Sequence, residues 1–176
     1  AAQNMWYRVT EATAGFPNLS NVVQLRGTAN ALIALKSDGT IWTWGTQTFL
    51  GNATAQTTRN RATQMTSPSA NPIKMIGATR NKATNGTSYY ILNADGNLYA
   101  LGENSDKQLG DWTTTDRTSW VQPKYTSAAG PVMNNIRWIS PQEHDENYGN
   151  INIINSDSVN YNWGLANGDM LGLLRQ

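Results

Sequence analysis

The stretch Ala31-Leu-Ile-Ala-Leu-Lys-Ser-Asp-Gly-Thr-Ile-Trp-Thr-Trp-Gly45 decides the fold that we expect for this chain. It begins with a short apolar run, passes through Asp38 and Gly39, and ends in a second run rich in strand-forming residues. An Asp-Gly pair between two such runs is a strong β-hairpin signal, because both turn residues tolerate positive φ angles. The stretch therefore predicts two antiparallel strands joined by a tight turn.

The same pattern occurs three times along the 176 residues. In each copy an aspartate precedes a closing glycine by seven positions; the pairs are Asp38 and Gly45, Asp95 and Gly102, and Asp157 and Gly164. No segment shows a sustained helical period, since Gly, Pro, Asn or Thr interrupts most candidates. The sequence thus predicts an all-β protein with three repeat units, at about residues 1–58, 59–116 and 117–176.

Apolar residues lie on both faces of the first hairpin strand. Leu32 and Ala34 would point to one side, and Ile33 and Leu35 to the other. A strand with two apolar faces is typical of a sheet that is covered on both sides. Since repeats of this length indicate a propeller or an array, we expect three small sheets stacked side by side.

The repeats resemble those of the regulator of chromosome condensation family, whose units are β-propeller blades. The family signature is an apolar strand ending in (Ser/Ala)-Asp-Gly, an aromatic strand ending in Trp-Gly, and a loop ending in Gln-Leu-Gly. The matches are Ser37-Asp-Gly39, Trp44-Gly45 and Leu50-Gly51; Ala94-Asp-Gly96, Leu101-Gly102 and Gln108-Leu-Gly110; Ser156-Asp157, Trp163-Gly164 and Leu171-Gly172. The resemblance covers nearly the whole chain. It implies propeller blades, with the Leu before each last glycine filling the gap between neighbours.

The chain departs from the family pattern in several places. Asn30 stands where the family often has a histidine, Leu101 replaces the tryptophan of the second copy, and Ser158 replaces the turn glycine of the third. Propellers of this family close with about seven blades, whereas three units cannot close a ring. We therefore expect a partial propeller that belongs to a longer chain; an open arc capped by a partner is the alternative.

Composition excludes several classes of protein. The net charge is +1, charged residues make up 14%, and no Lys/Arg run forms the basic footprint of a nucleic-acid binder. The absence of cysteine excludes disulfides, thiolate metal sites and cysteine catalysis. No apolar run approaches the ~20 residues that cross a bilayer. We expect neither a nucleic-acid partner nor a membrane span.

Catalytic and metal-binding motifs are missing from the sequence. It contains no Gly-x-Ser-x-Gly, no Gly-Lys-Ser/Thr loop and no His-Glu-x-x-His. His144 is the only histidine, and it lies in an acidic loop without a second cluster of ligands. Asp106, Asp111 and Asp116 lack the spacing of a calcium-binding loop. We therefore predict no catalytic residues, no metal site and no cofactor.

Two loops are candidates for binding. The loop from Asp111 to Trp120 contains Trp112, Arg117 and Trp120, residue types that are enriched at interface hot spots. The alternative is that its tryptophans pack between blades. The second candidate is the inserted loop from Gln142 to Tyr148, which contains His144 and Tyr148, because insertions between repeats form loops that often carry function. The alternative there is a solvated acidic loop.

These observations favour a non-enzymatic binding module. We expect a secreted or surface-displayed bacterial protein, adhesin-like, that presents blade loops to a protein or a glycan. The secreted, bacterial setting follows from the nearly neutral, Asn- and Thr-rich composition without cysteine. The family resemblance also implies two alternatives, a regulator that acts on a small GTPase and a secreted protein inhibitor of an enzyme.

Overall fold

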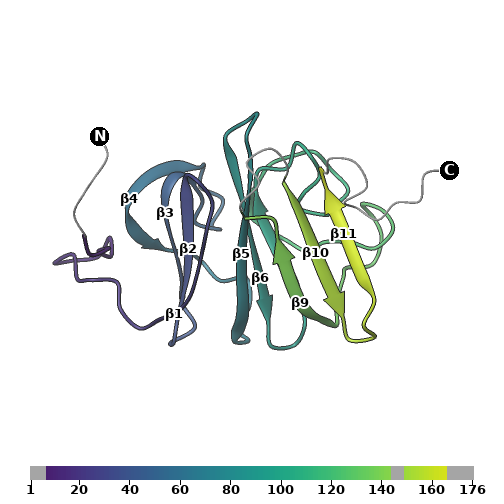
Figure 1. The fold of residues 1–176 in the computed structure, drawn as a ribbon, viewed down its shortest axis with the longest axis horizontal. Helices are drawn as coiled ribbons and strands as arrows, with labels where there is room; N and C mark the ends of the chain where they lie inside the picture. The colour runs from purple at the N-terminus through teal and green to yellow at the C-terminus, as the bar shows by residue number, and fades with distance from the viewer. Residues whose placement is uncertain (1–6, 144–148, 166–176) are drawn as a thin grey trace.

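The fold consists of three antiparallel sheets in a row. The computed structural model describes residues 7–143 and 149–165, and in this part of the chain every regular element is a β-strand. Sheet order follows chain order, and within each sheet every strand pairs with the strands next to it in sequence (Figure 1). The protein is therefore all-β, as the sequence predicts.

We call the sheets blades 1, 2 and 3. Blade 1 comprises β1 (Val22–Gly27), β2 (Ala31–Lys36), β3 (Ile41–Thr48) and β4 (Thr57–Gln64). Blade 2 comprises β5 (Ile73–Asn81), β6 (Gly86–Asn93), β7 (Leu98–Gly102) and β8 (Arg117–Val121). Blade 3 comprises β9 (Ile136–Pro141), β10 (Asn150–Asn155) and β11 (Asn160–Gly164).

The three predicted hairpins form with the expected turns. Gly39 and Gly96 have φ angles of 82° and 80°, and Ser158 adopts 65° at the same position of the third turn. Asp38 closes the first turn, because its carboxylate accepts hydrogen bonds from the backbone and the hydroxyl of Thr40, at 3.0 and 2.6 Å. The third hairpin thus keeps its turn without a glycine, at the cost of a side chain in the left-handed region.

The glycine that closes each hairpin is required by close packing. Gly45, Gly102 and Gly164 all have positive φ angles, between 104° and 120°. A Cβ atom at any of them would collide with a backbone carbonyl oxygen of the partner strand or the residue before it. The repeated glycine is therefore explained by the backbone approach in all three blades.

The core lies between the blades. Alternate side chains of β6 point to opposite sides: Tyr89 and Ile91 pack against blade 1, while Tyr90 and Leu92 pack against blade 3. Every residue of β6 is buried. Fully burying one such large apolar side chain stabilises the fold by about 1.5–3 kcal/mol, so the two interfaces hold the stack together.

Asn30, at the position where the family often has histidine, joins blade 1 to blade 2. Its side-chain amide donates to the backbone oxygen of Asn85 at 3.1 Å and its oxygen accepts from the Thr87 hydroxyl at 3.3 Å. Of the leucines predicted to fill the gaps between blades, Leu109 is fully buried between blades 2 and 3, Leu50 is half-buried, and Leu171 lies outside the described residues.

The sheets of blades 1 and 2 extend past the predicted boundaries between the repeat units. The boundary after residue 58 lies inside β4, and the boundary after residue 116 directly precedes β8. Both strands pair with the preceding strand and so complete blades 1 and 2. The sequence did not reveal them as blade strands, because β4 (Thr-Thr-Arg-Asn-Arg-Ala-Thr-Gln) has no apolar alternation.

Candidate functional site

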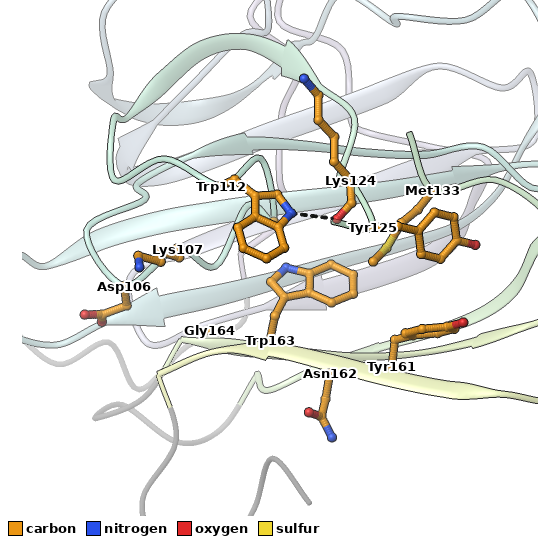
Figure 2. A pocket seen from close by; sticks show the side chains of 11 residues that line it. Asp106, Lys107, Trp112, Lys124, Tyr125, Met133, Tyr161, Asn162, Trp163 and Gly164 are labelled. Carbon is orange, nitrogen blue, oxygen red and sulfur yellow. Dashed lines mark hydrogen bonds between the residues drawn. The ribbon is translucent and has the colours of Figure 1, made fainter. Parts of the chain in front are cut away.

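An aromatic cleft lies between blades 2 and 3. Its volume is about 390 Å³, and we define it by its apolar lining: Trp112, Tyr125, Met133, Tyr161 and Trp163 (Figure 2). The first three come from the loops around β8, and the other two come from β11. Asp106, Lys107 and Lys124 add charge at the border of the cleft. The site thus combines segments of two repeats that are distant in sequence.

Trp112 holds an unfavourable backbone conformation. Its φ angle is 66°, two residues after Gly110 at 69°; the first repeat has the same geometry at Ala53, with 67°, two residues after Gly51 at 73°. Left-handed geometry costs a residue with a Cβ roughly 1–2 kcal/mol. The second repeat nevertheless carries a tryptophan there, and 52% of its surface is exposed.

Hydrogen bonds fix both indoles and leave their ring surfaces to form the cleft. Trp112 Nε1 donates to the Lys124 carbonyl oxygen at 3.0 Å, as Figure 2 shows. Trp163 Nε1 donates to the Gln108 carbonyl oxygen at 3.0 Å, and the indole covers Gly110, where a Cβ would clash with it. Neither indole N–H is therefore available to a ligand.

The tyrosine end of the cleft is also ordered. The rings of Tyr125 and Tyr161 meet edge to face, with centroids 5.5 Å apart. Burial raises the pKa of Tyr125, and its hydroxyl donates to the Asn134 carbonyl oxygen at 3.4 Å. This tyrosine is consequently neutral at physiological pH and adds an apolar ring edge.

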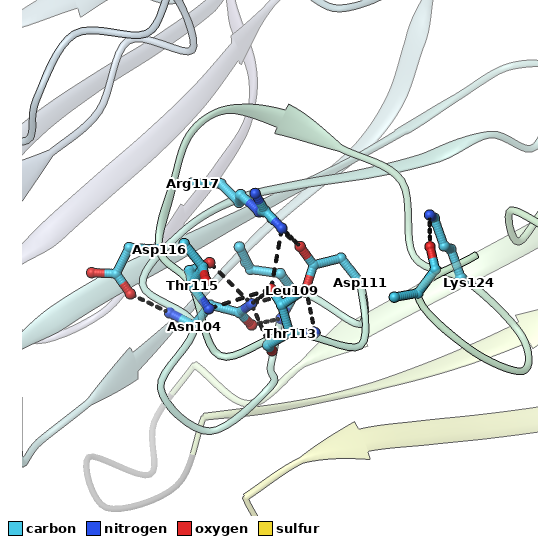
Figure 3. A network of polar contacts seen from close by, with 9 residues as sticks. Asn104, Leu109, Asp111, Thr113, Thr115, Asp116, Arg117 and Lys124 are labelled. Carbon is cyan, nitrogen blue, oxygen red and sulfur yellow. Dashed lines mark hydrogen bonds and ion pairs between the residues drawn. The ribbon is translucent and has the colours of Figure 1, made fainter. Parts of the chain in front are cut away.

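A polar network holds the loop that contains Trp112 in shape (Figure 3). Asp111 is buried, and its carboxylate binds Arg117 at 2.6 Å and accepts from the backbone and hydroxyl of Thr113 at 3.0 and 2.8 Å. The buried amide of Asn104 donates to the same carboxylate at 3.0 Å. Neighbouring residues on both sides of Trp112 are thus fixed, which determines where the indole lies.

The charge state of Asp111 follows from these contacts. Burial acts to raise its pKa, but hydrogen bonds from Thr113 and Arg117 outweigh burial and hold the pKa below the ordinary value. Asp111 is therefore ionised at neutral pH. Its ion pair with Arg117 stabilises the loop, and the guanidinium of Arg117 is engaged within the loop by Asp111 and Thr113.

The residues predicted to bind partners lie in different places. Trp112 lies in the cleft. Arg117 contributes the ion pair just described and begins β8. Trp120 packs between blades 1 and 2, where its Nε1 donates to the Thr66 carbonyl oxygen at 2.8 Å. His144 and Tyr148 lie outside the described residues. The structure brings Trp112, but neither Arg117 nor Trp120, to the cleft.

Sequence reasoning missed most of the cleft. Trp163 was read as part of the repeat signature, and Tyr125, Met133 and Tyr161 were not singled out. The one available signal was that two aromatic residues of the third hairpin, Tyr161 and Trp163, would share a face by strand alternation. Which neighbouring loop that face meets depends on blade stacking.

Within residues 7–143 and 149–165, no group of three His, Asp or Glu side chains lies close enough to hold a metal ion. The three aspartates considered for calcium bind other partners. Asp106 accepts from Asn81, Asp111 pairs with Arg117, and Asp116 accepts from the Asn104 backbone. The described part of the chain also has no helix that would span a bilayer.

No protein-family model and no curated protein sequence matches this chain. Solved structures do. Human WBSCR16 superposes with a TM-score of 0.57 at 18% identity, over 81% of this chain and 33% of that one. Yeast RCC1 (Prp20), solved bound to Kap60, superposes with a TM-score of 0.52 at 17% identity, over 85% and 33%.

These likenesses define the fold class. The three sheets are β-propeller blades of the RCC1-like type, arranged as a partial, open propeller. The chain spans about a third of the length of either neighbour.

Proposed function

We propose that this chain is a non-enzymatic protein-binding module whose contact site is the aromatic cleft. The observation that carries the proposal is Trp112, a large aromatic residue that is half exposed in a left-handed conformation. Backbone strain of this kind persists where surrounding structure imposes it, and it is concentrated at functional sites. Exposed tryptophans beside a cleft are also typical interface hot spots.

The structural neighbours support a protein partner. One of them was solved in complex with the protein Kap60. Both alternatives from the sequence, a regulator of a small GTPase and a secreted inhibitor of an enzyme, likewise require contact with a protein. The proposal therefore covers a class of function that these alternatives share.

We place the module in a secreted or surface-displayed bacterial protein, in an adhesin-like role, as part of a larger propeller. The support is the composition: charged residues are few, cysteine is absent, and Asn, Thr, Ser and Gln supply the polar surface. The length of the neighbours, about three times the matched part, supports further blades.

A peptide library displayed on phage tests the proposal. Clones selected on the immobilised chain are retested on the W112A and W138A variants. Alanine at position 112 copies Ala53, which holds the same backbone geometry in blade 1, so W112A should fold. Trp138 is the matched control, because it is 55% exposed on β9 and does not line the cleft.

We expect the selected clones to bind wild type and W138A and to lose their binding to W112A. Enrichment of clones that bind all three proteins equally would overturn the cleft as the contact site. Failure to enrich any clone would overturn peptide binding itself.

A further inference from the structure

The border of the aromatic cleft is asymmetric in charge. Lys107 is exposed, and its amine makes no hydrogen bond or ion pair with the described residues. The amine of Lys124 donates to the Ala128 carbonyl oxygen. Among the described residues that line the cleft, the one carboxylate is that of Asp106, which accepts a 2.6 Å hydrogen bond from Asn81. Among the described residues, Lys107 is therefore an unpaired cation of the border, whereas the Asp106 carboxylate already accepts a hydrogen bond from Asn81.

The position of Lys107 is fixed by buried side chains. Its φ angle is 61°, so it is a second residue of the cleft in the left-handed region. Its backbone N–H donates to the Asn104 carbonyl oxygen at 3.0 Å, and its carbonyl accepts from Gly110 at 3.0 Å. Gln108 and Glu103, both buried, hydrogen-bond each other beneath this turn. The same loop thus presents Lys107 and Trp112 together.

The floor of the cleft favours an apolar ring over a hydroxyl-rich ligand. Both indole N–H groups and the Tyr125 hydroxyl already donate to backbone oxygens. A sugar would lose hydrogen bonds to water there without replacing them, which costs free energy. An aromatic side chain has at most one hydrogen-bonding group, so it loses far less and gains edge or face contacts with the rings.

We propose that the cleft takes an acidic peptide segment with an aromatic residue, its ring between Trp112 and Trp163 and a neighbouring carboxylate on Lys107. This inference rests on the proposed function and specifies its ligand. Charge complementarity selects the acidic residue, and the apolar lining selects the ring. A basic segment would meet Lys107 with the same charge and is disfavoured.

Fluorescence anisotropy with labelled peptides tests the inference. The probes are Asp-Glu-Trp-Glu-Asp, its charge-reversed form Lys-Lys-Trp-Lys-Lys, and Asp-Glu-Ala-Glu-Asp without the ring. A labelled neutral oligosaccharide, cellohexaose, is the fourth probe. Each is titrated against wild type, W112A, K107E and the control W138A, at low and high salt.

We expect wild type and W138A to prefer the acidic tryptophan peptide. W112A should bind it about tenfold more weakly, and K107E should lose the preference for acidic over basic peptide. High salt should reduce the preference in wild type, because the pair with exposed Lys107 is screened.

Equal binding of the acidic and basic peptides, or unchanged preference in K107E, would overturn the inference. Binding of cellohexaose without peptide binding would overturn it in favour of a sugar. Library clones that lack acidic residues but still require Trp112 would refute this inference alone and leave the proposed function standing.

Discussion

Two adjacent tyrosines of β6 occupy buried sites with different hydrogen bonding. Tyr89 and Tyr90 are both fully buried, one against blade 1 and the other against blade 3. The Tyr90 hydroxyl donates to the Gln108 carbonyl oxygen at 2.8 Å. The Tyr89 hydroxyl has no hydrogen-bond partner among the described residues. Burial raises the pKa of both, so each stays protonated and needs an acceptor.

Phenylalanine at these two positions should therefore have opposite effects. Y90F removes a satisfied hydrogen bond and should lower the free energy of unfolding by about 1 kcal/mol. Y89F removes a buried hydroxyl without a partner and should be neutral or stabilising. Urea unfolding of the two variants, which remove the same atom from neighbouring residues, measures the difference. A larger loss for Y89F would contradict this hydrogen-bond assignment.

Asp111 should make the free energy of unfolding depend on pH in the acidic range. Its folded pKa lies below the ordinary value of 3.8, so its contribution is complete at neutral pH and is lost as the pH falls through the folded pKa. D111N should cost about 1–3 kcal/mol at neutral pH, because Arg117 loses its partner. The wild type and D111N curves of unfolding free energy should converge as the pH falls below the ordinary value of 3.8 and through the folded pKa of Asp111. Parallel curves down to that pH would refute the role of this carboxylate.

At the scale of elements, the hairpins were predictable from sequence and the outer strands were not. Asp-Gly turns and closing glycines identify a hairpin from local geometry alone. β8 illustrates the opposite case. Leu101 stands where the other repeats have tryptophan, and Trp120 on the adjacent β8 instead packs over Gly51, as Trp163 packs over Gly110. Sequence spacing does not show that a neighbouring strand supplies the missing ring.

For a similar reason, the sequence identifies only one of the two tryptophans that form the candidate site. Trp112 was recognisable as a hot-spot residue type in a loop. Its partner Trp163 belongs to another blade, and the two meet only because blade 3 stacks on blade 2. Arg117 and Trp120 have the same composition signal as Trp112, but their contacts are with the loop network and the core. Composition does not separate these three roles.

The first hairpin gives the cleanest test of turn geometry. Gly39 has a φ angle of 82°, and a Cβ there would meet no atom within 4 Å. G39V should therefore cost about 1–3 kcal/mol through backbone strain alone, without steric clash. G39N is the matched variant, because asparagine tolerates positive φ angles better than valine does. Its loss of stability should therefore be much smaller. Thermal unfolding of both reports the difference, and equal melting temperatures would contradict the hairpin assignment.

At the scale of the molecule, the two outer faces of the stack differ. One row across blade 2 contains Gly77, Tyr90 and Ala100, all buried against blade 3. The equivalent row of blade 3 contains Ser140, Asn152 and Asn162, which are at least partly exposed. A polar row of this kind reduces the apolar area on the outer face of blade 3.

The outer face of blade 1 exposes aliphatic side chains of its first strand. Val23 and Leu25 of β1 are 58% and 48% exposed. By strand pairing, Leu25 shares a face with Ala34 and Trp42, which are both buried, so Leu25 is the exposed member of this row. Exposed apolar patches of this kind mark interaction surfaces or promote association. Each outer face thus combines apolar and polar side chains, since Trp138, which is 55% exposed, lies on the same face of blade 3 as Ser140 and Asn152.

The polarity of blade 3 should control association of the chain. The variant N152I/N162V places two aliphatic side chains on the outer face of blade 3. We expect this variant to self-associate more strongly as its concentration rises, because exposed apolar sheet faces are buried when two molecules meet. N152Q/N162Q adds bulk without apolar surface and should sediment as wild type does. L25N on blade 1 should weaken any association of wild type. Analytical ultracentrifugation compares the four proteins at matched concentrations. Unchanged sedimentation of N152I/N162V would contradict this prediction, because it would show that the two asparagines do not limit self-association through this face.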